Sequence, residues 1–227
     1  MDILGGIEGT LGGIEGTLSF VPQLLPAARV TILLTCVSMA FGLMIGLLVA
    51  LARIGPYRLL RAAMMIYIEI IRGTPLLVQL VYIYFVLPAA GVAIDAIPAA
   101  IAALSLNYGA YMSEVYRAAI LSIEKGQMEA ALSLGYTSRQ ALWQIVIPQS
   151  LLVAIPSLGG YFIALLKDSS LASVIAVVEI LKTTNIIAGQ TFRTVEVYTA
   201  AALMYLAMSV PISFFVRRLE RGMRLHV

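Results

Sequence analysis

The sequence predicts an all-α protein whose helices span a membrane. Of its 227 residues, 61% are hydrophobic and only 12% are charged, and the mean hydropathy is +0.96. Soluble domains carry about 25% charged residues. A helix needs about 20 apolar residues to cross a bilayer core about 30 Å thick, and stretches of that length occur five times along the chain. This composition argues against a soluble enzyme.

The five predicted spans differ in how continuous they are. The first contains no charge, whereas the second is interrupted by Arg72-Gly73-Thr74-Pro75. A further apolar segment, residues 171–189, contains Glu179 and Lys182. We expect it to form an extracytoplasmic or re-entrant helix packed on the bundle rather than a sixth crossing. The predicted spans run over about residues 30–52, 62–87, 97–120, 145–166 and 197–216.

The distribution of basic residues predicts the orientation of the bundle, because cytoplasmic loops concentrate Lys and Arg. Residues 1–28 contain three acidic residues and no basic one, and the connector after the first span has three Arg and no acid. The tail after the fifth span has four Arg against one Glu. We therefore expect the N-terminus outside, the C-terminus in the cytoplasm, and a cytoplasmic connector over about residues 121–144.

Two domains are predicted, a tail over residues 1–28 and a membrane domain over residues 29–227. The tail contains the heptapeptide Leu-Gly-Gly-Ile-Glu-Gly-Thr twice in tandem, at residues 4–10 and 11–17. A repeat this short indicates a local duplication rather than a repeat fold. The acidic start lacks the basic region of a cleavable signal peptide, so we expect a flexible extracytoplasmic tail and a first span that inserts as a reverse anchor.

Several chemistries are excluded by the residues that the chain lacks. Its one cysteine, Cys36, and one histidine, His226, exclude an intrachain disulfide, a Cys-based zinc cluster and a buried catalytic triad. Neither G-x-x-x-x-G-K-[ST] nor G-x-G-x-x-G occurs, so we expect no ATP hydrolysis, no catalytic residue, no metal and no cofactor on this chain. The basic residues are divided among short loops, which argues against nucleic-acid binding.

The cytoplasmic connector, about residues 121–147, predicts two short helices joined by a Gly corner. The first covers Gly126–Leu134 and stops at Gly135, a residue suited to a left-handed cap. Thr137 or Ser138 caps a second helix, Arg139–Ile147, which Pro148 follows. This protrusion fits either a docking surface for a partner or a pair of helices on the membrane surface without a partner.

Four motifs follow one another along the chain. They are Arg72-Gly73-Thr74-Pro75-Leu76-Leu77-Val78-Gln79, Glu114-Val115-Tyr116-Arg117, Gly126-Gln127 with Glu129-Ala130-Ala131, Gly135 and Ile145-x-Ile147-Pro148, and Lys167-Asp168-Ser169-Ser170-Leu171. Together they resemble the permeases of ABC importers for polar amino acids, the histidine, glutamate, glutamine, arginine and opine type. The resemblance covers about residues 25–225, and the final Ile147-Pro148 departs from the family only in having Ile where Leu is common.

The resemblance implies a type I importer in a bacterial inner membrane that works by alternating access. Its partners would be a cytoplasmic ATPase dimer carrying ATP and Mg, a second permease of the same or a homologous sequence, and an extracytoplasmic amino-acid-binding protein. The connector would then be a coupling helix seated in a groove of the ATPase. The residues expected to carry this contact are Glu129, Ala130, Ala131 and Gly135.

Charges inside the spans need a partner or a water-filled path, since each costs about 2.5 to 3.5 kcal/mol at the bilayer centre. The pairs Glu69/Arg72 and Glu114/Arg117 are spaced i,i+3 and can neutralise one another on one helix face. Arg72 also adjoins the helix break, and broken helices often line transport sites.

A zwitterionic amino acid needs an anion for its ammonium group and donors for its carboxylate. Asp168 can supply the anion and Arg72 a donor, although Lys167 and Asp168 can instead form a local ion pair, and Asn107, Tyr108 and Tyr111 can simply join helices. The residues that we expect to bind substrate are Arg72, Gln79, Asn107, Asp168, Ser169 and Ser170.

Two rival functions remain open at this stage. An ion-coupled secondary transporter would use Glu69 or Glu114 as its titrating group and would need no ATPase. A membrane anchor would dock a cytoplasmic protein and transport nothing.

Overall fold

The computed structural model describes residue 13 and residues 15–223, and every regular element in this part of the chain is helical. The all-α prediction is confirmed. Short 3-10 or π-helical segments join several helices: η1 (Tyr82–Val86), η2 (Leu87–Ala90), η3 (Leu142–Val146) and η4 (Ser169–Ile175). The α-helices are α2 (Val21–Ile54), α3 (Arg58–Gly73), α4 (Leu76–Val81), α5 (Ala96–Ser122), α6 (Lys125–Ser133), α7 (Ser138–Ala141), α8 (Ile147–Asp168), α9 (Ile180–Thr191) and α10 (Thr194–Met223).

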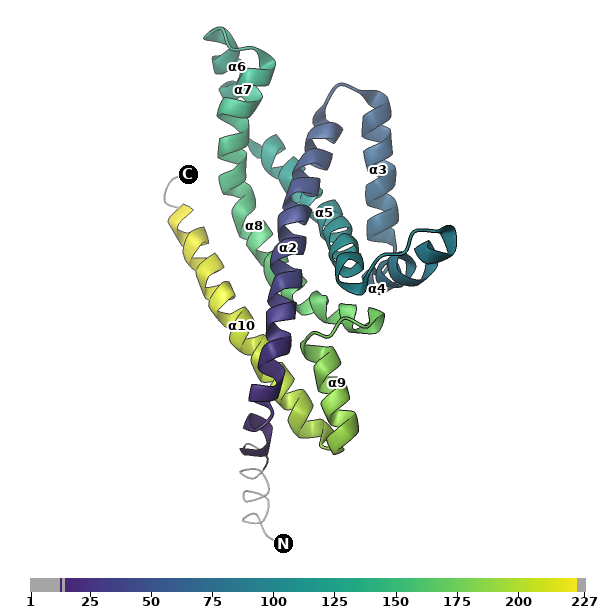
Figure 1. Ribbon diagram of the computed structural model, residues 1–227. Helices are drawn as coiled ribbons and strands as arrows, with labels where there is room; N and C mark the ends of the chain where they lie inside the picture. The colour runs from purple at the N-terminus through teal and green to yellow at the C-terminus, as the bar shows by residue number, and fades with distance from the viewer. Residues whose placement is uncertain (1–12, 14, 224–227) are drawn as a thin grey trace.

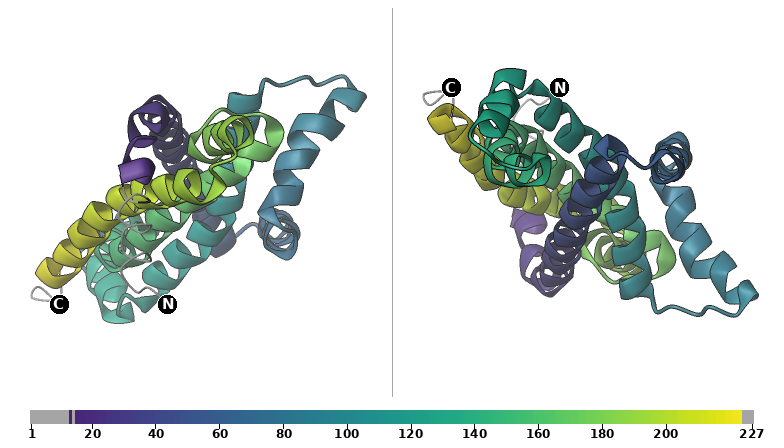
Figure 2. Two further views of the ribbon diagram at one scale, coloured as in Figure 1. Left: turned by 90° about the horizontal axis from the view of Figure 1, so that it is seen from below. Right: turned by 90° about the horizontal axis from the view of Figure 1, so that it is seen from above.

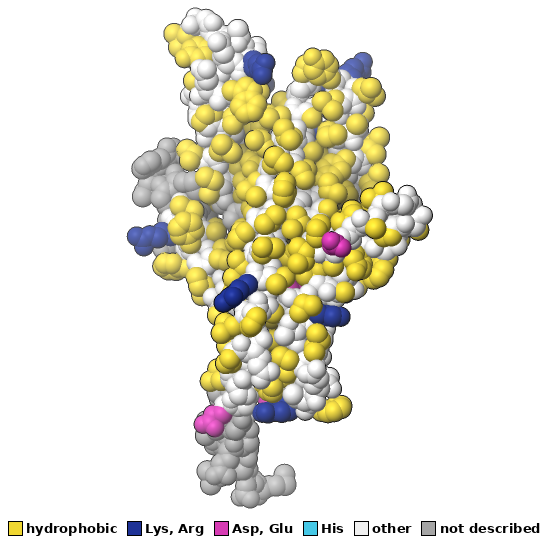
Figure 3. Space-filling view, viewed as in Figure 1, with side chains coloured by type: hydrophobic (Ala, Val, Ile, Leu, Met, Phe, Trp, Pro, Cys, Tyr) yellow, Lys and Arg dark blue, Asp and Glu magenta, His cyan; other side chains and the backbone are white. Residues whose placement is uncertain are grey.

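The helices form an elongated bundle with distinct ends (Figure 1). The α2–α3 connector and α6 lie at one end, toward which α10 runs without reaching it, and the start of α2 and the α9–α10 turn lie at the other. Seen along its length, the bundle has α3 and α4 set apart at one edge (Figure 2). Hydrophobic side chains cover a broad band over the middle of the molecule (Figure 3).

Glycines bring α2 and α5 into close contact. A Cβ added at Gly46 would lie 2.8 Å from the Cβ of Met112, and one added at Gly109 would lie 2.7 Å from Ile45 Cγ2. Small residues allow helix backbones to approach closely in membranes, where packing rather than water expulsion drives association. The contact fixes α5 against the longest helix of the described chain.

Three helical stretches are long and apolar enough to cross a membrane alone: Val21–Ile54, Ser138–Ile175 and Thr194–Leu219. The bent pair Arg58–Gly73 and Leu76–Ala90 would make a fourth. Helix α5 coincides with the predicted third span. Among the described helices, however, its hydropathy is too low for it to qualify as a membrane span by composition alone. The reason is its position, because buried polar residues such as Ser105, Asn107 and Ser113 face neighbouring helices rather than lipid.

The predicted interruption of the second span is confirmed. Helix α3 ends at Gly73, and the chain turns by 104° between the two members of the bent pair. Pro75 precedes α4 with the φ of −62° that its ring imposes, and Thr74 is extended. Residues 62–87 therefore do not form one straight span.

The connector folds as predicted in its first half and differently in its second. Helix α6 ends at Ser133, Gly135 is left-handed with φ +89°, and Thr137 forms a capping box with Gln140. The prediction of a separate second helix ending before Pro148 is wrong, since α7, η3 and α8 form one continuous helical stretch. The turns just before Pro148 are π-helical, and this wider winding accommodates a residue that has no N–H to donate.

Helix α9 has 12 residues, too few to cross the bilayer, which agrees with the predicted non-crossing segment. Its N-cap, Glu179, is fully buried and accepts hydrogen bonds from the backbone N–H groups of Leu181 (2.9 Å) and Lys182 (2.7 Å) and from the Tyr205 hydroxyl (2.8 Å). Burial raises the pKa of the Glu179 carboxyl, and these hydrogen bonds oppose that shift. The network ties α9 to α10.

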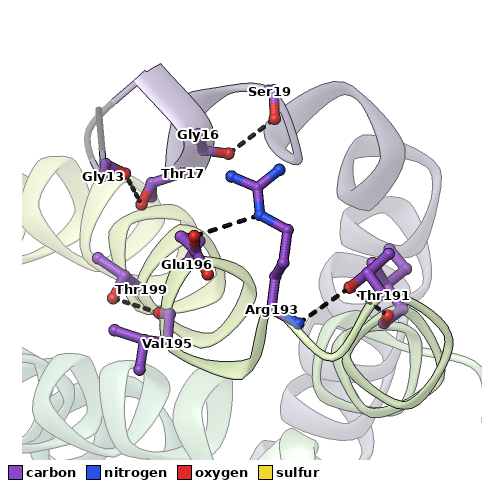
Figure 4. A network of polar contacts seen from close by, with 10 residues as sticks. Gly13, Gly16, Thr17, Ser19, Thr191, Arg193, Val195, Glu196 and Thr199 are labelled. Atoms are coloured by element: carbon purple, nitrogen blue, oxygen red, sulfur yellow. Dashed lines mark hydrogen bonds and ion pairs between the residues drawn. The ribbon is translucent and has the colours of Figure 1, made fainter. Parts of the chain in front are cut away.

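The predicted boundary at residue 28 falls inside α2, which begins at Val21, and residues 1–12 and 14 of the predicted tail lie outside the described residues. The second heptapeptide copy reaches the α9–α10 turn (Figure 4). A Cβ at Gly16 would lie 2.2 Å from Arg193 Nη2, and the Arg193 guanidinium lies 5.0 Å from the Phe20 ring centroid and pairs with Glu196 (3.2 Å).

Candidate functional site

A polar cavity of about 540 Å³ lies where the α3–α4 break meets α5 and α8. At the break, backbone groups lack the hydrogen-bond partners that a continuous helix would give them. Helices α5 and α8 supply the side chains of the opposite walls. Its size falls within the range of about 300–1,000 Å³ that is usual for small-molecule sites. The lining residues are Arg72, Gly73, Thr74, Pro75, Leu76, Asn107, Tyr108, Tyr111, Tyr161, Ala164 and Asp168.

The cavity brings together one cation and one anion from distant parts of the sequence. Arg72 closes α3, and its guanidinium carbon lies 5.2 Å from the centre of the Tyr111 ring. Asp168 ends α8, and its Oδ2 accepts a hydrogen bond of 2.8 Å from the Tyr108 hydroxyl. In the described part of the chain no ion pair engages either charge. Both charges are therefore open to a ligand.

Of the expected local pairs, only Glu114/Arg117 forms within the described residues, and Glu114 has a second partner that was not expected. Arg72 and Glu69 make no ion pair within the described residues, and the Lys167–Asp168 pair is also absent there. Glu114 does pair with Arg117 (3.0 Å), and it also binds Arg53 of α2, a partner that i,i+3 spacing could not reveal. This cluster joins α2 to α5 away from the polar cavity.

Gln79 supports the cavity from behind its wall. Its amide Nε2 donates to the Ile71 carbonyl (2.7 Å) and the Thr74 hydroxyl (2.9 Å), which ties α4 back to the end of α3. Its Oε1 accepts from Asn107 Nδ2 (3.0 Å), and both residues are largely buried. Of this pair, Asn107 lines the cavity, while Gln79 holds the break in shape.

Ser169 and Ser170 lie outside the cavity. Ser169 is fully buried, and its hydroxyl donates to the Leu166 carbonyl at 2.8 Å. Ser170 is half-buried in η4 and does not line the cavity. The four other predicted substrate residues are in the cavity or hydrogen-bonded to its wall.

An aromatic cluster that the sequence did not predict completes the site. The Tyr161 ring lies 6.2 Å from the Tyr108 ring and 6.0 Å from the Tyr111 ring. Tyr161, Ala164 and Asp168 are spaced i, i+3, i+7 on α8, so they share one helix face. That spacing was available in the sequence as a signal for Tyr161.

The predicted coupling residues divide between the surface and the interior. Glu129, Ala130 and Gly135 are exposed at the α6 end of the molecule, whereas Ala131 is buried with 5% of its surface accessible. Leu134 is 80% exposed beside the left-handed Gly135. Leu134 was not among the predicted coupling residues.

The lining of the cavity combines charged, amide and aromatic groups. A carboxylate, a guanidinium, an amide and tyrosine rings can hold a zwitterion by hydrogen bonds and charge. The described residues contain no group of three or more His, Cys, Asp or Glu side chains arranged to hold a metal ion.

Residues 42–225 match the family model described as the binding-protein-dependent transport system inner membrane component. The chain is 41% identical over 210 residues to the L-cystine transport system permease protein TcyB of Bacillus subtilis (strain 168), covering 92% of this chain and 90% of that protein. It is 38% identical over 207 residues to the glutamine transport system permease protein GlnP of Escherichia coli (strain K12), covering 90% and 94%.

Solved structures of ABC transporters share the fold of this chain. An amino acid ABC transporter crystallised with histidines matches with a TM-score of 0.85 and 35% identity, over 92% of this chain and 98% of that chain. An inward-facing MetNI methionine ABC transporter matches with a TM-score of 0.76 at 22% identity, over 90% and 98%. The chain therefore shares the fold of type I ABC permeases.

Proposed function

This chain belongs to the family of binding-protein-dependent transport system inner membrane components and is the permease subunit of an amino-acid ABC importer, and we propose that its polar cavity binds the amino acid in transit. Asp168 would hold the ammonium group and Arg72 the carboxylate. Asn107 would add a hydrogen bond, and Gln79 would keep the broken helix in shape around the ligand.

The observation that carries this proposal is the pair of opposite charges in one cavity without a counter-ion from the described chain. Charges at membrane depth are costly unless they serve a ligand or a water-filled path. A polar amino acid carries the complementary pair of charges. Its side chain would lie against the rings of Tyr111 and Tyr161.

We propose that the chain crosses the bacterial inner membrane five times, with the bent α3–α4 pair and α5 as the second and third crossings. The N-terminal end would lie outside and the α6 end in the cytoplasm. Arg58, Arg61, Lys125 and Arg139 belong to the α6 end, as the distribution of basic residues in cytoplasmic loops requires.

The partners follow from this orientation. The corner formed by Glu129, Ala130, Leu134 and Gly135 would dock on a separate ATPase subunit that binds ATP and Mg, while Ala131 packs inside the connector. A second permease, identical or homologous, would cover the exposed α3 side, where only Ile68 of α3 is buried within the chain. A binding protein would deliver the amino acid at the opposite end.

The experiment uses the complete complex of permease, ATPase and binding protein in proteoliposomes, with uptake of labelled amino acids. Asp168→Asn and Arg72→Gln each remove one charge-assisted hydrogen bond worth about 1.5 to 3 kcal/mol, so we expect uptake at limiting substrate to fall about 10- to 100-fold. Asp95→Asn and Arg58→Gln are the matched controls, since neither residue lines the cavity.

Coupling is tested in the same preparation. Glu129→Ala should lower ATP-driven uptake while leaving amino-acid binding to the permease unchanged. Wild-type uptake by both cavity variants would contradict the binding assignment, and uptake by the permease alone down an ion gradient would contradict the importer mechanism.

A further inference from the structure

A second cavity, of about 710 Å³ and larger than the polar cavity, lies along a different face of α8. It is a groove bounded by α2, α8 and α10. Met39 and Leu158 form a buried floor, and Phe215 and Leu219 form an exposed rim, with 61% and 40% of their surfaces accessible. Every described residue that lines it is apolar, and it shares no lining residue with the polar cavity.

The groove results from the way α8 and α10 meet. The helices touch where Gly159 faces Val216, and a Cβ at Gly159 would lie 2.6 Å from Val216 Cγ1. Pro211 lies inside α10 and Pro156 inside α8, and prolines within helices remove backbone bonds and bend them. The groove lies beside this close contact.

Two arginines stand on α10 among the residues that line this apolar groove, and Arg218 follows the rim residue Phe215 by one helical turn (i,i+3). Arg217 and Arg218 directly follow Val216 on α10, and both are exposed. The sequence continues with Arg221 and Arg224 against a single acid, Glu220. The groove therefore combines an apolar lining with exposed arginines on the last turns of the candidate span Thr194–Leu219.

We propose that this groove binds an anionic glycerophospholipid, with one acyl chain along Leu158, Ile212 and Phe215 and the phosphate at Arg217 and Arg218. Basic clusters just beyond a membrane-spanning helix attract anionic head groups at about 1 kcal/mol per residue. The exposed rim faces hydrocarbon, where an acyl chain is the available apolar ligand. The inference uses the proposed orientation of the permease at one point only, which is to place the lipid in the cytoplasmic leaflet.

The test measures lipid retention by the purified complete complex and needs no transport assay, so it can succeed or fail independently of the amino-acid assignment. The complex is incorporated in nanodiscs of phosphatidylglycerol and phosphatidylcholine in equal amounts, released into mild detergent and analysed by native mass spectrometry. Wild-type protein should retain phosphatidylglycerol in preference to phosphatidylcholine.

Two kinds of variant distinguish binding of the lipid head group from binding of its acyl chain. Arg217→Gln with Arg218→Gln should lower the preference for phosphatidylglycerol on the order of 30-fold, at about fivefold per charge. The charge-matched control is Arg58→Gln with Arg61→Gln, at the same end of the bundle but off the groove. Ile212→Trp should displace both lipids by filling the groove, whereas Val210→Trp, on the same helix but outside the groove, should displace neither.

Three outcomes would overturn the proposal. Equal retention of the two lipids by wild type, or an equal effect of the two arginine pairs, would remove the head-group assignment. Unchanged retention in Ile212→Trp would remove the acyl-chain assignment. A disulfide-linked permease dimer through Ile155→Cys, in a Cys36→Ser background, would show that a second permease rather than lipid fills the groove.

Discussion

Replacing Gly46 by Ala tests whether the α2–α5 contact holds the bundle together. The added methyl group would lie 2.8 Å from Met112 Cβ and 3.2 Å from the Gly109 carbonyl oxygen. Neither atom can rotate away, because one is attached directly to the backbone and the other is part of it. The two helices must therefore separate or shift to admit the methyl group.

The expected change in the free energy of unfolding is the sum of two opposing effects of the added methyl group. Overpacking costs about 1 to 3 kcal/mol, and exchanging Gly for Ala within a helix returns about 0.8 to 1.0 kcal/mol. The matched control is Gly160→Ala in α8, where a Cβ meets nothing within 4 Å, so only the helix-propensity gain remains. The two variants should differ by about 1 to 3 kcal/mol, with Gly46→Ala the less stable.

The assay is thermal unfolding of the purified permease complex in one detergent, followed by circular dichroism. A difference of 1 to 3 kcal/mol corresponds to about 2 to 12 °C for a chain of this size. If Gly46→Ala and Gly160→Ala unfold at the same temperature, the close α2–α5 approach does not limit stability and the reasoning is wrong.

The remaining predictions concern other parts of the chain. Glu114→Gln leaves two arginines without their shared acid and should lower the free energy of unfolding by about 1 to 3 kcal/mol, which chemical denaturation would detect. Gly135→Ala forces a methyl-bearing residue to φ +89° and should loosen the connector by about 1 kcal/mol, seen as faster hydrogen exchange there, while Gly126→Ala should not. Deleting residues 4–10 leaves the same heptapeptide before Leu18, so the melting temperature should stay within about 2 °C; a larger fall would show that the first copy contributes contacts of its own.

Much of the fold could be predicted because its signals are local. The break after Arg72 needed only Gly73 and Pro75 in sequence, and the left-handed corner needed only Gly135 after a run of helix formers. The merging of α7 with α8 could not be predicted in this way, since Pro148 ordinarily marks a helix boundary and π-helical turns have no sequence signature of their own.

The candidate site was harder to predict because its walls come from three parts of the chain. Arg72, Asn107 and Asp168 were recognisable as polar groups in apolar spans, but Ser169 points away although it adjoins Asp168. Neighbouring residues on a helix face different directions, and only the packing of α5 and α8 decides which one meets the cavity. For the same reason, Ala131 is buried while Ala130 is exposed.

The uninterrupted course from α7 into α8 has a mechanical consequence. Residues 138–168 make one rod of about 45 Å at 1.5 Å per residue, with the α6–α7 corner at one tip and the carboxylate of Asp168 at the other. This rod can absorb a displacement only at the π turns next to the α6–α7 corner or at Pro156, which lies inside α8. If both points stay rigid, a tilt of a few degrees at the corner moves the Asp168 carboxylate by about 2 Å.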